Sequence, residues 1–184
     1  MLALSQRACW IASALCIAVS SSSCASSKAG AKDEAEIRHF VSEFYDWYAK
    51  LQTQRFEGFT ADAALRKRPT AFDAELARLL RRDFDAQSRC ADIVGIDWDP
   101  IAGNQDPAER FLVGRILTSK RGHRVEVYGF HENARGAKPD VIAEVARVNG
   151  RWVFVDFFCP DCESLVEALK RPLPPCDDLP SRKR

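Results

Sequence analysis

The fold is decided by a stretch that predicts two paired strands, Asp140-Val-Ile-Ala-Glu-Val-Ala-Arg-Val-Asn-Gly-Arg-Trp-Val-Phe-Val-Asp-Phe-Phe158. At its centre, Asn149-Gly150 is a dipeptide favoured by two-residue hairpin turns, because both turn residues need a positive φ. We therefore predict strands over 140–148 and 151–158. The second of these strands is apolar on both faces, which predicts a central place in the sheet.

The sequence before this hairpin predicts further strands, which in turn follow helices. Residues 111–118 and 123–131 predict another strand pair, separated at Gly122. Apolar residues at helical spacing predict helices over 33–53 and 71–88. This order, with helices first and an antiparallel sheet afterwards, predicts an α+β fold in which N-terminal helices pack on a curved sheet.

The remaining segments are predicted to be short helices, a loop and an irregular C-terminal end. A short helix is expected within 56–67 and another over 163–170. Residues 97–107 form a loop by their turn chemistry, and the Pro-rich end 172–184 is expected to be irregular.

The first two helices carry the most informative side chains. Asp33 is positioned to cap the first helix and Thr70 the second. One face of the first helix is an aromatic and aliphatic stripe, which is typical of core; it consists of Ile37, Phe40, Val41, Phe44, Tyr45, Trp47, Tyr48 and Leu51. On the second helix, Asp83 and Gln87 fall within the apolar face, where a carboxylate must find polar partners.

The first 23 residues have the pattern of an export signal. Arg7 is their only charged residue, and an apolar run over 8–19 precedes small polar residues. That run is too short to span a membrane. Because Cys24 follows directly, we expect cleavage after Ser23 and acylation of the Cys24 thiol; the alternative is ordinary cleavage nearby, for example after Ala25.

An export signal also predicts the localisation of the protein and its domain organisation. Ala25 stands where an Asp would retain a lipoprotein at the inner membrane, so we expect a periplasmic protein anchored to the outer membrane. Residues 24–32 would form a flexible tether, and 33–171 the folded domain.

Cysteine usage fits an oxidising compartment. Of seven cysteines, two leave with the signal and Cys24 would carry lipid. Four remain, which predicts two disulfides: Cys90, Cys159, Cys162 and Cys176. Four cysteines allow three pairings, and the sequence does not choose among them.

Overall charge argues against one class of partner. The chain has 27 Lys and Arg residues against 26 Asp and Glu residues, and loss of Arg7 with the signal makes the mature chain neutral. Nucleic-acid binding demands a basic face, so no nucleic-acid partner is expected.

Several segments together resemble a known family. These are Phe44-Tyr-Asp-Trp-Tyr48, the Asp83…Gln87 pair, Gly95-Ile-Asp-Trp-Asp-Pro100 with Gln105-Asp-Pro107, Pro139-Asp-Val-Ile-Ala-Glu-Val145 and Gly150-Arg-Trp-Val-Phe-Val155. They resemble a family of small exported bacterial proteins known only as a domain of unknown function, which is similar to the nuclear-transport-factor-2-like cone fold. The resemblance covers about residues 35–170 and implies a fold and an envelope location, without an established activity.

A cone fold would leave a pocket between its helices and the concave face of its sheet. The candidate residues for that pocket are Asp83, Gln87, Tyr45, Trp47, Asp97 and Asp106. Burial raises the pKa of a carboxyl, so Asp83 could serve there as a general base. The interpretation we favour is structural, with Asp83 accepting backbone N–H bonds from the 97–106 loop.

Other chemistry is less supported. Cys159-Pro-Asp-Cys162 lies between a strand and a helix, like a thioredoxin active site, but only 22 residues follow it. A structural disulfide is therefore preferred. The carboxylates of 97–106 fail the spacing of a calcium loop, and Asx turns are the simpler interpretation. No zinc set and no catalytic histidine arrangement is found, so no metal or cofactor is expected.

Three functions remain as hypotheses. The first is a non-catalytic envelope lipoprotein that binds an envelope protein or a small ligand through its pocket or sheet. The second is a small cone-fold hydrolase or isomerase that uses Asp83. The third is a thiol–disulfide protein that uses Cys159 and Cys162.

Overall fold

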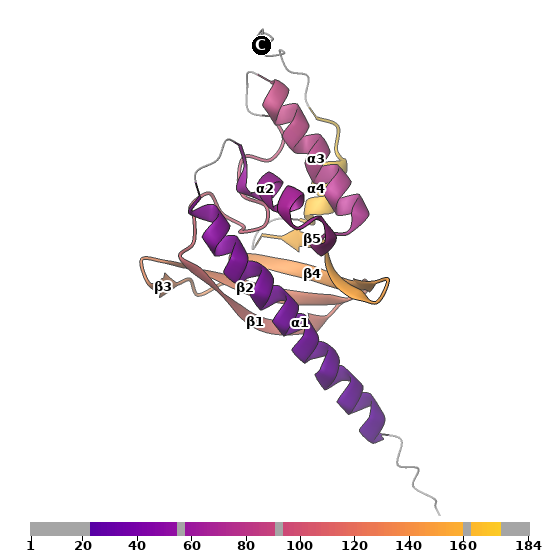
Figure 1. Ribbon diagram of the computed structural model, residues 1–184. Coiled ribbons are helices and arrows are strands. Elements are labelled where there is room, and N and C mark those ends of the chain that lie inside the picture. Colours follow the sequence, from indigo (N-terminus) through magenta and orange to yellow (C-terminus); the bar gives the residue numbers. More distant parts are fainter. Residues whose placement is uncertain (1–22, 55–57, 91–93, 160–162, 174–184) are drawn as a thin grey trace, which may run out of the picture.

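The computed structural model describes residues 23–54, 58–90, 94–159 and 163–173. They form helices and one antiparallel sheet, which confirms the α+β class (Figure 1). In chain order the elements are α1 Ser23–Gln52, α2 Thr60–Lys67, a 3₁₀ turn Pro69–Ala71, α3 Ala74–Arg89, β1 Arg110–Thr118, β2 His123–His131, β3 Ala134–Arg135, β4 Val141–Val148, β5 Arg151–Phe158 and α4 Leu165–Lys170.

The sheet has the order β1-β2-β4-β5, with the short β3 paired to β2. All of these pairs are antiparallel. The predicted hairpin between β4 and β5 is confirmed: Asn149 and Gly150 have φ of 50° and 78°, as a two-residue turn with both φ values positive requires. The two-residue strand β3 was not expected from the sequence.

Strand β5 lies at the edge of the sheet, so the central place predicted for it is wrong. Its open edge is covered by other parts of the chain. The backbone N–H of Asp73 donates to Phe154 O at 2.8 Å, and Phe158 forms a bridge with Ser164. Covering an edge strand with helices and loops buries it as a neighbouring strand would, which explains its apolar residues on both faces.

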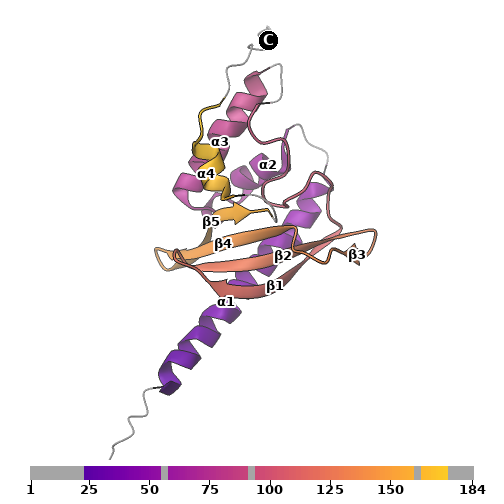
Figure 2. The ribbon, with the colours of Figure 1, turned by 180° about the vertical axis from the view of Figure 1, so that it is seen from behind.

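Helix α1 crosses one face of the sheet, and the opposite face carries no helix in the view from behind (Figure 2). The predicted stripe is confirmed, with Phe44, Tyr45 and Tyr48 each no more than 1% exposed. The helix begins at Ser23 rather than Asp33. The stretch 24–32, expected as a flexible tether, is thus helical, because it is rich in Ala and Lys and contains no Pro.

The remaining predicted helices are present, but some begin or end at other residues than expected. Helix α3 is capped by Asp73, whose side chain accepts from the backbone N–H of Glu75 at 2.9 Å. Thr70 is not the cap, because it lies within the 3₁₀ turn that begins at Pro69. The short helices expected near 56–67 and 163–170 are present as α2 and α4. None of the helices in the described part of the chain is long and apolar enough to cross a membrane.

Candidate functional site

Asp83 and Gln87 meet on the buried side of α3, as their spacing predicts. Gln87 Nε2 donates to Asp83 Oδ2 at 2.7 Å and to Ile96 O at 2.8 Å, and the Ile96 N–H reaches Asp83 Oδ2 at 3.2 Å. Asp83 is 1% exposed, and burial raises its pKa. Gly95 has φ +75°, and a Cβ there would lie 2.2 Å from Asp83 Oδ1. The backbone donor is Ile96 and not, as expected, a residue of the 97–106 loop. This carboxylate therefore fastens the segment before the loop to α3.

Asp83→Asn is expected to destabilise the protein by about 1–3 kcal/mol, because it removes a charged acceptor from a buried N–H and amide. Asp83→Leu should cost more, since it offers no acceptor. Chemical denaturation measures both. Asp85→Asn, on the exposed side of the same helix, is the matched control and should change stability by less than about 0.5 kcal/mol. Wild-type stability in both Asp83 variants would instead indicate a carboxylate held for function.

Tyr45 and Trp47 lie apart from this pair. The Tyr45 hydroxyl is buried and donates to Ile101 O at 2.7 Å. Trp47 is partly buried, and the Arg68 guanidinium lies 4.5 Å from its ring centroid. Both residues thus have structural partners: Tyr45 holds the 97–107 loop and Trp47 stacks with a cation.

The sequence analysis did not single out Asp99, which organises that loop. Its Oδ1 accepts the N–H groups of Ile101 and Ala102 at 3.0 and 3.1 Å, which is the expected Asx turn. The Tyr48 hydroxyl also donates to this carboxylate, with its oxygen 2.6 Å from Oδ2. Burial raises the pKa of Asp99, although these hydrogen bonds act in the opposite direction. Three aspartates lie between 97 and 106, and the contact with α1 distinguishes this one from Asp97 and Asp106.

Tyr45 and Tyr48 should resist ionisation in the folded protein. Burial and the charge of Asp99 raise the pKa of both phenols well above 10. Because the pKa of each phenol is higher in the folded state than in the unfolded state, the neutral phenols stabilise the fold. This stabilisation is complete at a pH below the unfolded-state pKa of about 10 and is lost as the pH rises through the higher folded-state pKa. In a Tyr128→Phe variant, which retains only these two tyrosines, tyrosinate absorbance should therefore rise together with unfolding followed by circular dichroism. Ionisation near pH 10 with the fold intact would contradict this.

Two cavities share Trp98 as a common wall. The first, here called the polar cavity, has a volume of about 290 Å³ and lies between the start of α2 and the 97–107 loop. It is lined by Gln52, Gly58, Phe59, Thr60, Ala61, Asp97, Trp98, Asp99, Gln105 and Pro107. Phe59, Asp97 and Gln105 are exposed, so this cavity opens to solvent.

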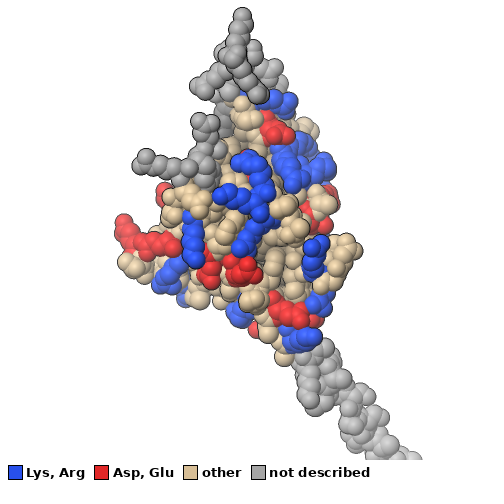
Figure 3. All heavy atoms as spheres, in the orientation of Figure 1, with Lys and Arg blue, Asp and Glu red and all other residues tan. Residues whose placement is uncertain are grey.

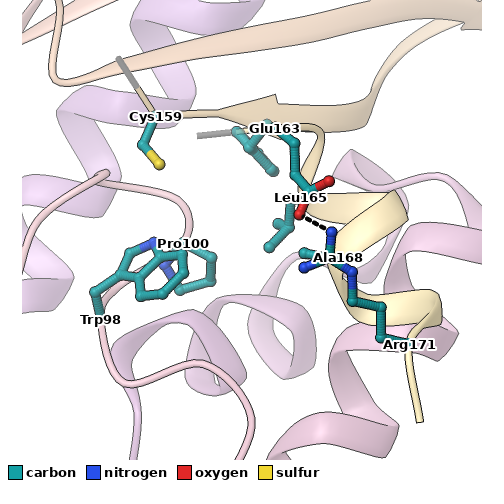
Figure 4. A pocket seen from close by; sticks show the side chains of 8 residues that line it. Trp98, Pro100, Cys159, Glu163, Leu165, Ala168 and Arg171 are labelled. Carbon is teal, nitrogen blue, oxygen red and sulfur yellow. Dashed lines mark ion pairs between the residues drawn. The ribbon is translucent and has the colours of Figure 1, made fainter. Parts of the chain in front are cut away.

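The second, here called the apolar cavity, also has about 290 Å³ and is lined by Trp98, Pro100, Phe157, Cys159, Glu163, Leu165, Ala168 and Arg171. Trp98 and Pro100 project into it from the loop, opposite Cys159 at the end of β5 (Figure 4). Glu163 and Arg171 form an ion pair at its side. Most of the described lining residues are apolar, and the two charges among them neutralise each other.

Of the six residues predicted for a pocket, Asp97 alone lines either of these cavities. Asp106 is exposed on the same loop. The interior between α1 and the sheet, where the pocket was expected, is filled by aromatic rings such as Phe44 and Phe154. Among the residues that the structure describes, no group of three or more His, Cys, Asp or Glu is placed to hold a metal ion.

Comparison with known proteins adds no relative: no family model, no curated protein and no solved structure matches this chain.

Proposed function

We propose that this protein is an exported envelope lipoprotein that acts as a non-catalytic binding or accessory module. One contrast carries the proposal. The carboxylates of the buried Asp83 and the half-buried Asp99 are held by internal donors. The polar cavity, by contrast, opens to solvent beside Asp97 and Thr60, whose side chains have no hydrogen bond within the described part of the chain. This arrangement argues against Asp83 as a general base, because a general base needs a carboxylate that can reach its substrate, and it leaves the polar cavity as a place for binding.

The cone fold is part of the same proposal. The quoted motifs suggest it, and helix α1 lying across an antiparallel sheet is compatible with it. The motif residues Tyr45, Tyr48 and Asp99 join α1 to the 97–107 loop. In this proposal the motifs maintain the loop that forms the polar cavity.

Surface charge supports a partner other than nucleic acid. Groups of Lys and Arg side chains and groups of Asp and Glu side chains lie beside one another on the face that α1, α2 and α3 form (Figure 3). Many are paired across the surface, as Arg68 is with Glu43 and Arg147 with Glu36. A mixed surface of this kind does not attract a phosphate backbone strongly.

Intact mass measurement of the exported protein tests the anchor. We expect a chain that begins at Cys24 and carries lipid, and a Cys24→Ser variant that does not. An unmodified wild-type chain beginning after Ala25 would reject the lipoprotein part of the proposal while leaving the binding part to its own test.

Site-specific photocrosslinking tests binding. A photoreactive residue in place of Gln105, at the polar cavity, should give a discrete adduct in cells. The same residue in place of Lys138, which is exposed beyond β3, is the matched control and should not. Equal labelling from both positions, or none from position 105, would contradict a binding role for this cavity.

The two disulfides remain a prediction, and the position of Leu173 supports one of the three possible pairings. Cys162 and Cys176 lie outside the described residues. Leu173 packs against the cluster that contains Cys90, and the three residues to Cys176 span up to about 10 Å, within reach of a disulfide. We therefore expect Cys90–Cys176 and Cys159–Cys162. Peptide mapping without reductant should find these two pairs and no free thiol among the four; a Cys90–Cys159 peptide would contradict this pairing.

A further inference from the structure

The polar cavity combines aromatic surface with polar groups that the protein leaves available. Phe59 is 38% exposed although it is a large apolar residue, and one side of its ring stacks on Phe84 at 5.4 Å. Trp98 provides a second aromatic wall. Exposed aromatic surface in a concave site is a common mark of ligand binding.

The polar groups around these rings have unused hydrogen-bonding capacity. The Asp97 carboxylate, the Thr60 hydroxyl and the Trp98 indole N–H have no hydrogen bond within the described part of the chain. Gln105 donates its amide nitrogen to Asp97 O at 3.3 Å, and its amide oxygen has no hydrogen bond to a described residue. The cavity therefore offers both donors and acceptors beside apolar rings.

Charge restricts the chemistry of the occupant. The carboxylates of Asp97 and Asp99 line the cavity and Asp106 lies on the same loop, while no Lys or Arg is among the lining residues that the structure describes. An anionic ligand would be repelled. A small ligand with apolar faces and a rim of hydroxyl groups fits all of these features.

We propose that the polar cavity binds one ring of an uncharged saccharide, with its C–H face against Phe59 or Trp98 and its hydroxyl groups on Asp97, Thr60 and Gln105. A volume of about 290 Å³ is at the small end of ligand pockets and suits a single ring. This inference deepens the proposed function and rests on it for its biological setting.

The position of the cavity agrees with a glycan of the envelope. Gln52 lines the cavity at the last residue of α1, whereas Cys24, the expected anchor, is the second residue of the same helix. At 1.5 Å per residue these ends lie about 40 Å apart along the axis. The first turns of α1 run beyond the sheet (Figure 1), so the cavity is at the end of the helix remote from the anchor.

Isothermal titration of the purified mature protein with N,N′-diacetylchitobiose, an uncharged disaccharide, tests the proposal. We expect binding with a Kd of about 0.1–1 mM and no binding of glucuronic acid, which is anionic. Asp97→Ala and Phe59→Ala should each weaken binding at least about tenfold, a loss of about 1.4 kcal/mol. Asp106→Ala, a carboxylate on the same loop that does not line the cavity, is the matched control and should bind as the wild type does.

No heat at about 20 mM disaccharide, equal binding of glucuronic acid, or an equal loss in Asp106→Ala would overturn the saccharide proposal. Circular dichroism of each variant establishes that it is folded. If one of the two cavity variants, Asp97→Ala and Phe59→Ala, does not fold, the other still tests the proposal. An adduct from position 105 without saccharide binding would retain the proposed binding role and reject the saccharide. If the exported protein carries no lipid but binds the saccharide, the role of the cavity is retained and the lipid anchor is rejected.

Discussion

Replacing Asp156 by Ala is expected to destabilise the protein by about 3–5 kcal/mol, because it removes a buried charged acceptor that four donors share. Asp156 is fully buried on β5. Its Oδ2 accepts from Arg121 Nη2 and from Ser164 Oγ, each at 2.5 Å. Its Oδ1 accepts the N–H groups of Phe157 and Val166 at 2.9 and 3.0 Å. Removing this side chain would leave all of these donors without their acceptor.

The effect of Asp156 on stability can be separated from a general effect of charge on the sheet. Glu126 lies on the same outer face and pairs with Arg115, whose side chain is 75% exposed. Glu126→Ala should cost less, about 1–3 kcal/mol, because its main partner, the Arg115 guanidinium, is exposed and can be hydrated once the carboxylate is lost. The N–H groups of Phe157 and Val166 at Asp156 are instead buried. Chemical denaturation of the two variants is the measurement. Similar losses in both would refute the central role assigned to Asp156.

Arg121 provides a second check. It pairs with Asp156 and with Glu144, which is 2% exposed. In a double-mutant cycle, Arg121→Met and Asp156→Asn should be strongly non-additive, because each removes the partner of the other. Additive losses would mean that the short contact between them contributes nothing. Since Ser164 caps α4, loss of Asp156 should also loosen the helix that forms one wall of the apolar cavity.

The sequence predicted which segments form helices and strands better than it predicted which elements pack beside each other. The Asn149-Gly150 turn and the stripe on α1 are local patterns, and both are confirmed. The place of β5 depends on what covers its edge, which no local pattern records. Residue patterns alone could not distinguish a strand buried by strands on both sides from one buried by a 3₁₀ turn and helices.

The candidate site shows the same limit. Asp83 and Gln87 were found because a polar pair on an apolar helix face is conspicuous. Asp99 was not, because it looks like its neighbours Asp97 and Asp106 until Tyr48 is brought to it from α1. Asp156 is inconspicuous for a similar reason, since an isolated acid in a strand usually faces solvent. Partners more than 50 residues away, as with Tyr48 and Asp99, lie beyond sequence periodicity.

Phe44→Ala should be among the most destabilising single changes in this protein, at about 3–5 kcal/mol. Phe44 is 1% exposed, and its ring lies 4.7 Å from that of Phe154 and 5.6 Å from that of Phe72. It also stacks on Tyr48 at 5.7 Å. One ring thus joins α1 to β5 and to the segment before α3, and its loss would leave a cavity among fully buried neighbours.

Two variants show whether this cost comes from packing. Leu117→Ala removes an apolar side chain that is 51% exposed on the outer face of the sheet, and should change stability by about 0.5 kcal/mol or less. Phe44→Leu retains most of the volume and should cost about 1.5 kcal/mol. A Phe44→Ala loss no larger than that of Leu117→Ala would contradict the packed interior. That result would also reopen the space between α1 and the sheet as a binding site, because the argument for the outer polar cavity depends on this interior being filled.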